Sequence, residues 1–419
     1  MDRQGSQSDQ TIVIGGGVVG LSIAVTLQQR GVSVLVLDTA VPGMGASWGN
    51  AGYIATEQVY PIADASMLPK LPAMLRDPLG PLRIDWRYLP RLASWGWRAL
   101  LNMLPANARR SHQALSSINA RSLDAWLRLA RSLGFGELIR VDGTLQSCET
   151  ESTERRLRAL GQALNAIGVE NVWLGSGALH EREPALAGNQ RGALFYPGTG
   201  HVTSPRAITL ALEDAFIRLG GRVLAHCRVH QAERVADGGL RLYTDQGEMR
   251  ATRVVLAAGA FSRGLARQLT GVSVPLDTER GYHLMLPAEK GRLKLPVASA
   301  DRRFVMTPMQ HGLRLAGTVE YAGLDAPPNM ARARNLRLLA DGMLRQSLDD
   351  SDAREWMGFR PTTADSVPVI DRQGPVFLAF GHHHLGLTQA AVTAEIIGAL
   401  YFDETPPIDP QPFRIGRFG

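Results

Sequence analysis

The chain contains little cysteine and almost no lysine. Its 419 residues include two cysteines, Cys148 and Cys227. This excludes a disulfide-built scaffold and a cysteine-ligated metal cluster, and it is typical of a reducing cytoplasm. We expect both thiols to be buried and structural. The net charge is +6, but the basic residues are nearly all arginine and are spread along the chain without a run of five. The charge therefore does not indicate a nucleic-acid partner.

Long apolar runs are also absent. No stretch reaches the roughly 18 apolar residues that a membrane-spanning helix needs. The first ten residues, MDRQGSQSDQ, lack the apolar segment of a signal peptide. The sequence therefore predicts a cytoplasmic protein. Apolar residues make up 45% of the chain, which at this length is enough for two or three domains' worth of core.

Residues 11–38 carry the most informative motif that is present. An apolar run leads into Gly15, Gly17 and Gly20, a helical segment follows, and a second apolar run ends at Asp38. This G-x-G-x-x-G between two strands is typical of dinucleotide binding. The first two glycines would make the tight turn and admit a pyrophosphate to the helix N-terminus, and the third would let helix and strand pack closely. Asp38 would bind ribose hydroxyls. The alternative is an ordinary tight turn in an α/β protein.

Periodicity and turn residues place the other elements. We expect helices at 113–134, 152–168, 204–219 and 389–402, and one that carries Leu336, Leu338, Leu339, Met343 and Leu344. We expect strands at 139–147, 171–174, 192–196, 222–225, 228–235, 240–244, 249–256 and 376–380, and a strand-rich region over 275–320.

The predicted fold class is α/β, with a Rossmann-type nucleotide-binding domain and a second, mixed-sheet domain for the substrate. The nucleotide-binding domain would be discontinuous and assembled from residues 9–60, 200–270 and 360–410. The substrate domain would combine residues 61–199 and 271–359. This division follows from the separated positions of the glycine-ended strands.

Four features favour FAD over NAD as the dinucleotide. The glycine motif stands at the very start of the chain. A second glycine-ended strand, VVLAAGA, occupies 254–260, and a third strand leads through a glycine into a helix over 377–391 (FLAFGHHHLGLTQAA). The loop ASWGNAGYI at 46–54 is richer in small residues than a plain connector needs. Several separate segments would therefore meet one long ligand.

These segments, with three more, occur in a characteristic order: GGGVVG with Asp38, ASWGNAGYI (46–54), TERGYHL (278–284), LRLAGTVE (313–320), WMGFRPTTADSVPVI (356–370) and GHHHLGLT (381–388). In this order the chain resembles the D-amino-acid oxidase superfamily of flavoproteins. Within it, the chain is most similar to the bacterial D-amino acid dehydrogenases, and above all to the D-hydroxyproline dehydrogenases that are built from one kind of chain.

The resemblance implies an FAD-dependent enzyme that oxidises a D-amino acid, with D-hydroxyproline or D-proline as the favoured substrate. Hydride would pass from the substrate Cα to flavin N5. The electrons would then pass to a quinone or an electron-transfer protein of the respiratory chain. Three alternatives stay open: an amine oxidase of the glycine or sarcosine oxidase type that uses oxygen, a flavin-binding module without turnover, and an NAD-dependent dehydrogenase.

The resemblance also assigns residues to the substrate site. Arg360 in GFRPTT matches the carboxylate-binding arginine of the family, and a planar guanidinium can bind both carboxylate oxygens at once. Tyr53, Tyr282, Phe304 and His383 are further candidates for this site. The residues expected to bind FAD are Gly15, Gly17, Val18, Val19, Gly20, Asp38, Ser47, Asn50, Ala51, Gly52, Val229, Ala258, Gly259, Gly381, Gly386, Leu387 and Thr388.

The triple histidine at 382–384 raises the alternative of a metal site. Zinc sites usually draw on four ligands, and no cysteine or helical histidine pair lies nearby in the sequence. We therefore expect no metal and place these histidines at the flavin edge. Cysteine is also missing near this segment, so we expect FAD to be bound without a covalent link.

Residues 81–105 alternate aromatic and arginine side chains: Trp86, Tyr88, Trp95 and Trp97 with Arg83, Arg87, Arg91 and Arg98. Such a segment suits peripheral contact with a membrane, which would here be the inner face. It equally suits a helix that covers the substrate domain with its aromatics turned inward.

Overall fold

A six-stranded sheet forms the centre of one half of the protein. The computed structural model describes residues 10–62, 65–77 and 79–419, so the expectation for the first residues lies outside it. The strand order is β10 (Arg222–Leu224), β2 (Val34–Leu37), β1 (Thr11–Ile14), β14 (Arg253–Leu256), β21 (Val376–Phe380) and β20 (Val369–Gln373). The first five are parallel and β20 is antiparallel to β21. Strands β1 and β21 are buried along their whole length, as their continuous apolar runs predict.

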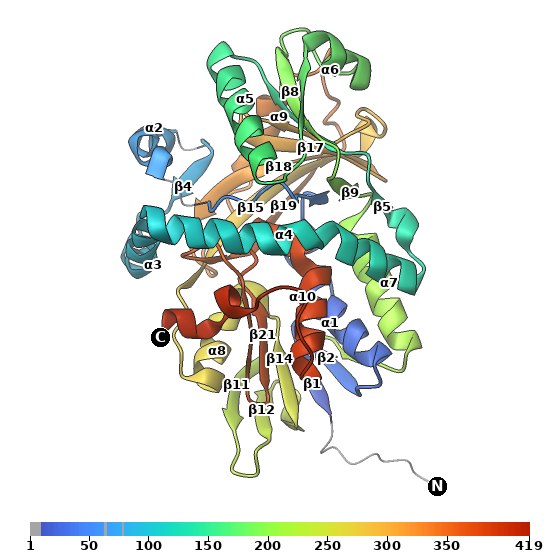
Figure 1. Cartoon of the computed structure of the whole chain (residues 1–419), viewed down its shortest axis with the longest axis vertical. Coiled ribbons are helices and arrows are strands. Elements are labelled where there is room, and N and C mark those ends of the chain that lie inside the picture. Colours follow the sequence, from blue (N-terminus) through green and yellow to red (C-terminus); the bar gives the residue numbers. More distant parts are fainter. Residues whose placement is uncertain (1–9, 63–64, 78) are drawn as a thin grey trace.

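Both faces of this sheet are covered (Figure 1). Helices α1 (Val18–Gln29), α4 (Pro105–Leu133), α7 (Pro205–Arg218) and α10 (Gly386–Tyr401) share one apolar core with Val13, Val36 and Val255 of the sheet. Helix α8 (Ser262–Thr270) and a small antiparallel sheet share the core on the opposite face. That sheet consists of β11 (Val229–Arg234), β12 (Leu240–Thr244) and β13 (Gly247–Ala251).

A nine-stranded mixed sheet forms the other half. Its order is β19 (Arg354–Thr363), β15 (Leu276–Leu286), β18 (Gly312–Tyr321), β17 (Phe304–Met309), β16 (Val297–Ser299), β6 (Thr144–Cys148), β8 (Gly192–Tyr196) and β7 (Val172–Gly175), with β4 (Leu82–Ile84) paired to β18. The helices on this half are α2 (Leu71–Arg76), α3 (Leu89–Asn102), α5 (Glu151–Ala166), α6 (Ser176–Arg182) and α9 (Ala331–Ala340). A three-stranded sheet of β3 (Tyr53–Ile54), β9 (Gly200–Val202) and β5 (Ile139–Arg140) completes the fold.

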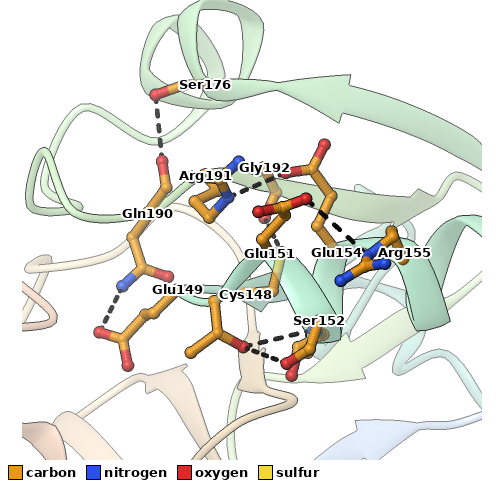
Figure 2. A network of polar contacts seen from close by, with 12 residues as sticks. Cys148, Glu149, Glu151, Ser152, Glu154, Arg155, Ser176, Gln190, Arg191 and Gly192 are labelled. Carbon is orange, nitrogen blue, oxygen red and sulfur yellow. Dashed lines mark hydrogen bonds and ion pairs between the residues drawn. The ribbon is translucent and has the colours of Figure 1, made fainter.

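Polar contacts fasten α5 to the outer edge of the large sheet (Figure 2). Arg191 Nε forms an ion pair with Glu154 Oε2 at 2.9 Å, and Gln190 Nε2 donates to Glu149 Oε1 at 3.0 Å. Nearby, Cys148 Sγ donates to Gly192 O at 3.6 Å. Both cysteines are free and buried, as expected. This network serves the edge of the sheet and does not reach the cavity described below.

The fold class and most elements agree with the sequence prediction, and three elements do not. The expected strand 139–147 is divided between β5 and β6, because Gly143 adopts a φ of 84° and turns the chain into another sheet. The expected strand 249–256 is likewise divided between β13 and β14. Helix α9 ends at Ala340, before Met343 and Leu344, which lie buried in the same core. The domain division stays a proposal; β19 crosses its boundary at residue 360.

Candidate functional site

A cavity of about 1100 Å³ is lined from both halves of the protein. The predicted residues that line it are Gly15, Gly17, Val18, Val19, Asp38, Ser47, Asn50, Ala51, Tyr53, Val229, Ala258, Gly259, Tyr282, Phe304, Arg360, His383, Gly386 and Leu387. The other four, Gly20, Gly52, Gly381 and Thr388, lie outside its lining. The fold therefore brings segments more than 300 residues apart in the sequence to one cavity.

The glycine turn after β1 leaves no room for side chains. Gly15 has a φ of 107°, and a Cβ there would lie 2.5 Å from Ala257 O. A Cβ at Gly20 would lie 1.9 Å from Gly15 O. The turn thus brings β1, α1 and the end of β14 into direct backbone contact, which leaves the backbone of the turn open to the cavity.

The N-terminus of α1 points its free N–H groups at the cavity. Its N-cap, Gly17, makes no side-chain capping bond, and the first turn contains no acidic residue. Val18 N donates to Ser47 Oγ at 2.9 Å. A helix end with unsatisfied N–H groups and no acidic side chain favours an anionic group such as a phosphate.

Asp38 lies at the end of β2 on the same cavity wall. Its Oδ2 accepts from Gly16 N at 2.7 Å and its Oδ1 from Ala40 N at 2.9 Å. Burial raises the pKa of Asp38, and these backbone N–H groups oppose that effect. Each carboxylate oxygen has more than one acceptor site, so the carboxylate is held in place and can still accept from a ligand hydroxyl. Cys227, whose N donates to Asp38 O at 2.8 Å, also lines this part of the cavity.

The loop at 46–52 is held by residues that the sequence reasoning missed. Arg314 of β18 donates to the backbone oxygens of Trp48, at 3.1 Å, and Asn50. His283 of β15 contacts Gly49 O through Nδ1 at 3.0 Å. Gly52 has a φ of 76°, which favours glycine. The sequence signal was available, since a histidine and an arginine stand inside otherwise apolar strands.

Arg360 of β19 lies in the wall formed by the large sheet. Its Nη1 donates to Thr318 O at 3.2 Å, and a Cβ at Gly281 would lie 2.4 Å from its Cζ. The guanidinium therefore lies directly over Gly281. Burial lowers the pKa of Arg360, and the nearby Glu279 carboxylate opposes this effect. Within the described residues Arg360 forms no ion pair, so its remaining donors are available to an anionic ligand.

Glu279 was not predicted, although it stands in the TERGYHL segment. It pairs in register with Arg360 across β15 and β19, and it is 2% exposed. Its Oε1 accepts from the Tyr321 hydroxyl at 2.8 Å. Burial raises the pKa of Glu279 and the positive charge of Arg360 lowers it. The pair places a fixed negative group behind the guanidinium.

The two predicted tyrosines line the cavity but use their hydroxyls differently. Tyr282 Oη donates to Glu320 Oε2 and accepts from Asn329 N at 3.2 Å. Burial raises the pKa of Tyr282 to about 12. Its hydroxyl thus already has a donor and an acceptor, so its suggested bond to a substrate carboxylate stays a prediction. Tyr53 Oη lies 2.9 Å from Thr144 Oγ1.

The three histidines contact three different partners. His382 Nε2 bonds Thr393 Oγ1 at 3.0 Å, His383 Nε2 accepts from Thr363 N at 3.1 Å, and His384 Nε2 contacts Gln58 Oε1. In the part of the chain that the structure describes, no three metal-binding side chains come together. Burial lowers the pKa of all three imidazoles. They are therefore neutral near pH 7.

The aromatic residues of 81–105 divide between the two expected roles. Trp95 Nε1 donates to Thr362 O at 3.1 Å and Tyr88 Oη donates to Asp277 at 3.0 Å, so these two fasten α3 to the large sheet. Trp86 and Trp97 are turned outward and are 62% and 64% exposed. Within the described residues, we find no helix with the length and apolar composition of a membrane span.

Comparisons with known proteins agree with this geometry. Residues 10–400 match the protein family described as FAD dependent oxidoreductase. The chain is 31% identical to the D-amino-acid oxidase of Bradyrhizobium diazoefficiens, over 97% of this chain and 98% of the relative. It is 27% identical to the D-amino acid dehydrogenase of Chromohalobacter salexigens, over 98% and 99%. The glycine oxidase of Geobacillus kaustophilus has the same fold, with a TM-score of 0.75 at 22% identity over 97% and 98% of the two chains.

Proposed function

The chain belongs to the family of FAD-dependent oxidoreductases, and from this premise we propose that it is a dehydrogenase of D-amino acids. The preferred substrate would be a cyclic secondary amine, D-hydroxyproline or D-proline. Bound FAD accepts the hydride that leaves the substrate Cα, and the imino acid formed then hydrolyses in water. The relatives named D-amino-acid oxidase and D-amino acid dehydrogenase support this substrate class.

The cavity residues fit FAD. The open glycine turn and the N-terminus of α1 would hold the pyrophosphate, and Asp38 would bind the adenosine ribose. The N-terminus of α10, at Gly386 and Leu387, would meet the flavin ring, where its dipole favours the negative charge of the reduced state. We propose that the cofactor is held without a covalent bond.

Arg360 is the observation that carries the substrate assignment. It is a buried guanidinium on the cavity wall with donors to spare, and Gly281 beneath it provides the space that it occupies. A carboxylate bound by two parallel N–H···O bonds would have a fixed orientation. Fixing the carboxylate fixes the α-hydrogen relative to the flavin, which is the main requirement of hydride transfer. Tyr53, Phe304 and His383 would bound the rest of the substrate.

An anaerobic screen tests the function directly. The purified holoenzyme is mixed with D- and L-amino acids, including D-hydroxyproline, D-proline, glycine and sarcosine, and the flavin absorbance is followed. Bleaching by D-amino acids is the expected result, fastest with the cyclic pair. Bleaching only by glycine or sarcosine would favour the amine oxidase alternative. No bleaching by any of them would favour a flavin-binding module, and protein without flavin absorbance would overturn the family premise.

The variant Arg360→Ala tests the carboxylate role. Loss of a charge-assisted bond costs about 1.5–3 kcal/mol, so the substrate concentration for half-maximal bleaching should rise by roughly 10- to 100-fold. The flavin spectrum of the resting protein should stay the same. Bleaching by the variant at the wild-type concentration would remove Arg360 from this role.

We further propose that an exposed apolar surface on α3 docks on an anionic lipid bilayer, where a quinone acceptor would be reached. This α3 surface consists of Trp86, Leu89, Trp97, Leu100, Leu101 and Leu104, which are 41–64% exposed. Exposed Arg87, Arg91 and Arg98 surround it. Tryptophan at the rim of an apolar face with arginines beside it is complementary to anionic headgroups above acyl chains.

Vesicle sedimentation tests the α3 surface. The holoenzyme should sediment with phosphatidylglycerol vesicles, should stay in solution with phosphatidylcholine vesicles, and should be released by salt. Replacing both Trp97 and Leu101 by serine should abolish sedimentation without changing the bleaching rate. Failure of the wild type to sediment with either vesicle would remove the lipid partner. Fast reoxidation by oxygen, rather than by a quinone analogue, would favour an oxidase.

A further inference from the structure

Glu57 is a buried carboxyl group that the function proposed above does not use. It is 9% exposed, and within the described residues its Oε2 has no hydrogen-bond partner. A buried carboxylate without a full set of partners is costly in free energy. Burial accordingly raises the pKa of Glu57 to about 7, and the Tyr53 hydroxyl that it faces is the largest opposing influence. Such groups beside a cavity are candidates for proton transfer.

The backbone around Glu57 is fixed from several sides. Ala55 N donates to Thr388 Oγ1 of α10 at 3.0 Å, and Gln58 O accepts from Asn119 Nδ2 of α4 at 2.9 Å. Val59 O contacts His112 Nδ1 of α4 at 2.8 Å. The carboxyl group is therefore held in place on the cavity wall rather than carried on a free loop.

The hydroxyls next to Glu57 form a chain whose direction can be worked out. Thr199 Oγ1 donates to Tyr196 O at 2.8 Å, so its single proton is used there. Thr144 must then donate to Thr199 across 2.8 Å, and Tyr53 must donate to Thr144 across 2.9 Å. In this arrangement the Tyr53 oxygen is free to accept a proton donor, either neutral Glu57 or a ligand in the cavity that Tyr53 lines.

We infer that Glu57, acting through the Tyr53 hydroxyl, takes the proton that a substrate ammonium group must lose before its Cα–H bond breaks. The N–H⁺ bond breaks as the proton moves to Tyr53 Oη, and the Tyr53 proton moves to a Glu57 carboxylate oxygen. The products are a neutral amine and a neutral carboxylic acid, which later returns the proton to water. The amine nitrogen keeps the electron pair that supports hydride departure. The inference rests on the proposed function.

The other titratable groups around Glu57 keep their charge near neutral pH. Tyr53 and Tyr196 both have their pKa raised, first by burial and then by the Glu57 charge. His201 of β9, which faces Asp142 and Arg140, has its pKa lowered to about 4 by burial. His384 contacts Gln58, and burial lowers its pKa to about 4. These groups do not change charge between pH 6 and 9, which leaves Glu57 as the group that titrates there.

The test compares Glu57→Gln with the wild-type holoenzyme over pH, with D-proline under anaerobic conditions. At pH 7.5 the variant should bleach about 100-fold more slowly, the scale of a lost proton acceptor. At pH 10.5, where much of the substrate is already the free amine, the two rates should agree within about threefold. Tyr53→Phe should show the same pH-selective loss. A merely structural effect would slow bleaching equally at every pH and would overturn the inference.

An infrared titration gives a second readout that does not depend on turnover. The wild type should show a protonated-carboxyl C=O band that disappears between pH 6 and 8, and Glu57→Gln should lack it. Glu289→Gln, another buried glutamate but one paired with Arg292, should keep the band. Persistence of the band in Glu57→Gln would overturn the inference while leaving the function intact. If no D-amino acid bleaches the wild type, the proposed function itself has failed.

Discussion

At the scale of single residues, the substrate wall depends on one missing side chain. Gly281 has ordinary backbone geometry, yet a Cβ there would lie 2.4 Å from Arg360 Cζ. Because the obstacle is the end of a flexible side chain, Gly281→Ala should fold and should push the guanidinium aside. We expect the substrate concentration for half-maximal bleaching to rise about tenfold, as a misplaced charge-assisted bond implies. Gly177→Ala, which enters open space, is the matched control. Equal substrate affinity in both variants would contradict this account.

Sequence reasoning reached residues that belong to motifs and missed those that act through tertiary contact. Gly15 and Asp38 could be predicted because the turn and the strand end are local features. Glu279 could not be assigned, because its value comes from its register opposite Arg360, 81 positions along the chain. Register between strands depends on the turn geometry and on the buried face of the whole sheet, which a single sequence does not specify.

At the scale of secondary structure elements, α4 supports the start of α10. Trp126 of α4 is fully buried, and its Nε1 donates to Leu387 O at 2.7 Å. Leu387 lines the cavity where the flavin is proposed to lie. The helix boundaries here were nearly predictable, since apolar spacing identified both helices. The contact between them was not, because it joins residues 261 positions apart.

Trp126→Phe should therefore weaken both stability and cofactor binding. The change leaves Leu387 O without its donor and creates a small void, which together cost about 2–4 kcal/mol. We expect a lower Tm and faster loss of FAD on dilution, measured by flavin fluorescence. Trp86→Phe, at a position 62% exposed, should leave both quantities at their wild-type values. An unchanged Tm in Trp126→Phe would show that the bond contributes little.

At the scale of the whole molecule, the two sheets work as one structure because the cavity is built between them. The expected α/β class was predictable from alternating apolar runs and helices. The exchange of chain segments between sheets was not: β5 and β6 are separated only by residues 141–143 yet join different sheets. Periodicity reports that a strand exists, whereas its partner depends on packing that involves distant residues.

This packing buries a set of histidines in neutral form, and that gives the protein a pH limit. Burial lowers the pKa of His201 and His384 to about 4 and of His283 and His382 to about 3. In the unfolded chain these groups titrate near 6.5. Between the folded and unfolded values the unfolded state binds more protons. The free energy of unfolding is therefore fully present above pH 6.5 and falls as the pH drops below it.

Each of these histidines removes up to about 1.4 kcal/mol per pH unit in that window, so the loss should be steep between pH 6 and 4. Glu57 acts in the opposite direction, since a raised carboxyl pKa stabilises the fold slightly as the pH falls from 7, but it is one group against four. We expect the Tm of the holoenzyme to fall sharply below pH 6 in a series of thermal melts. His201→Gln should flatten that fall, whereas His230→Gln, at an exposed position beside Asp245, should leave it unchanged. A Tm that is constant from pH 7 to 4.5 would mean that these histidines are already protonated in the folded protein.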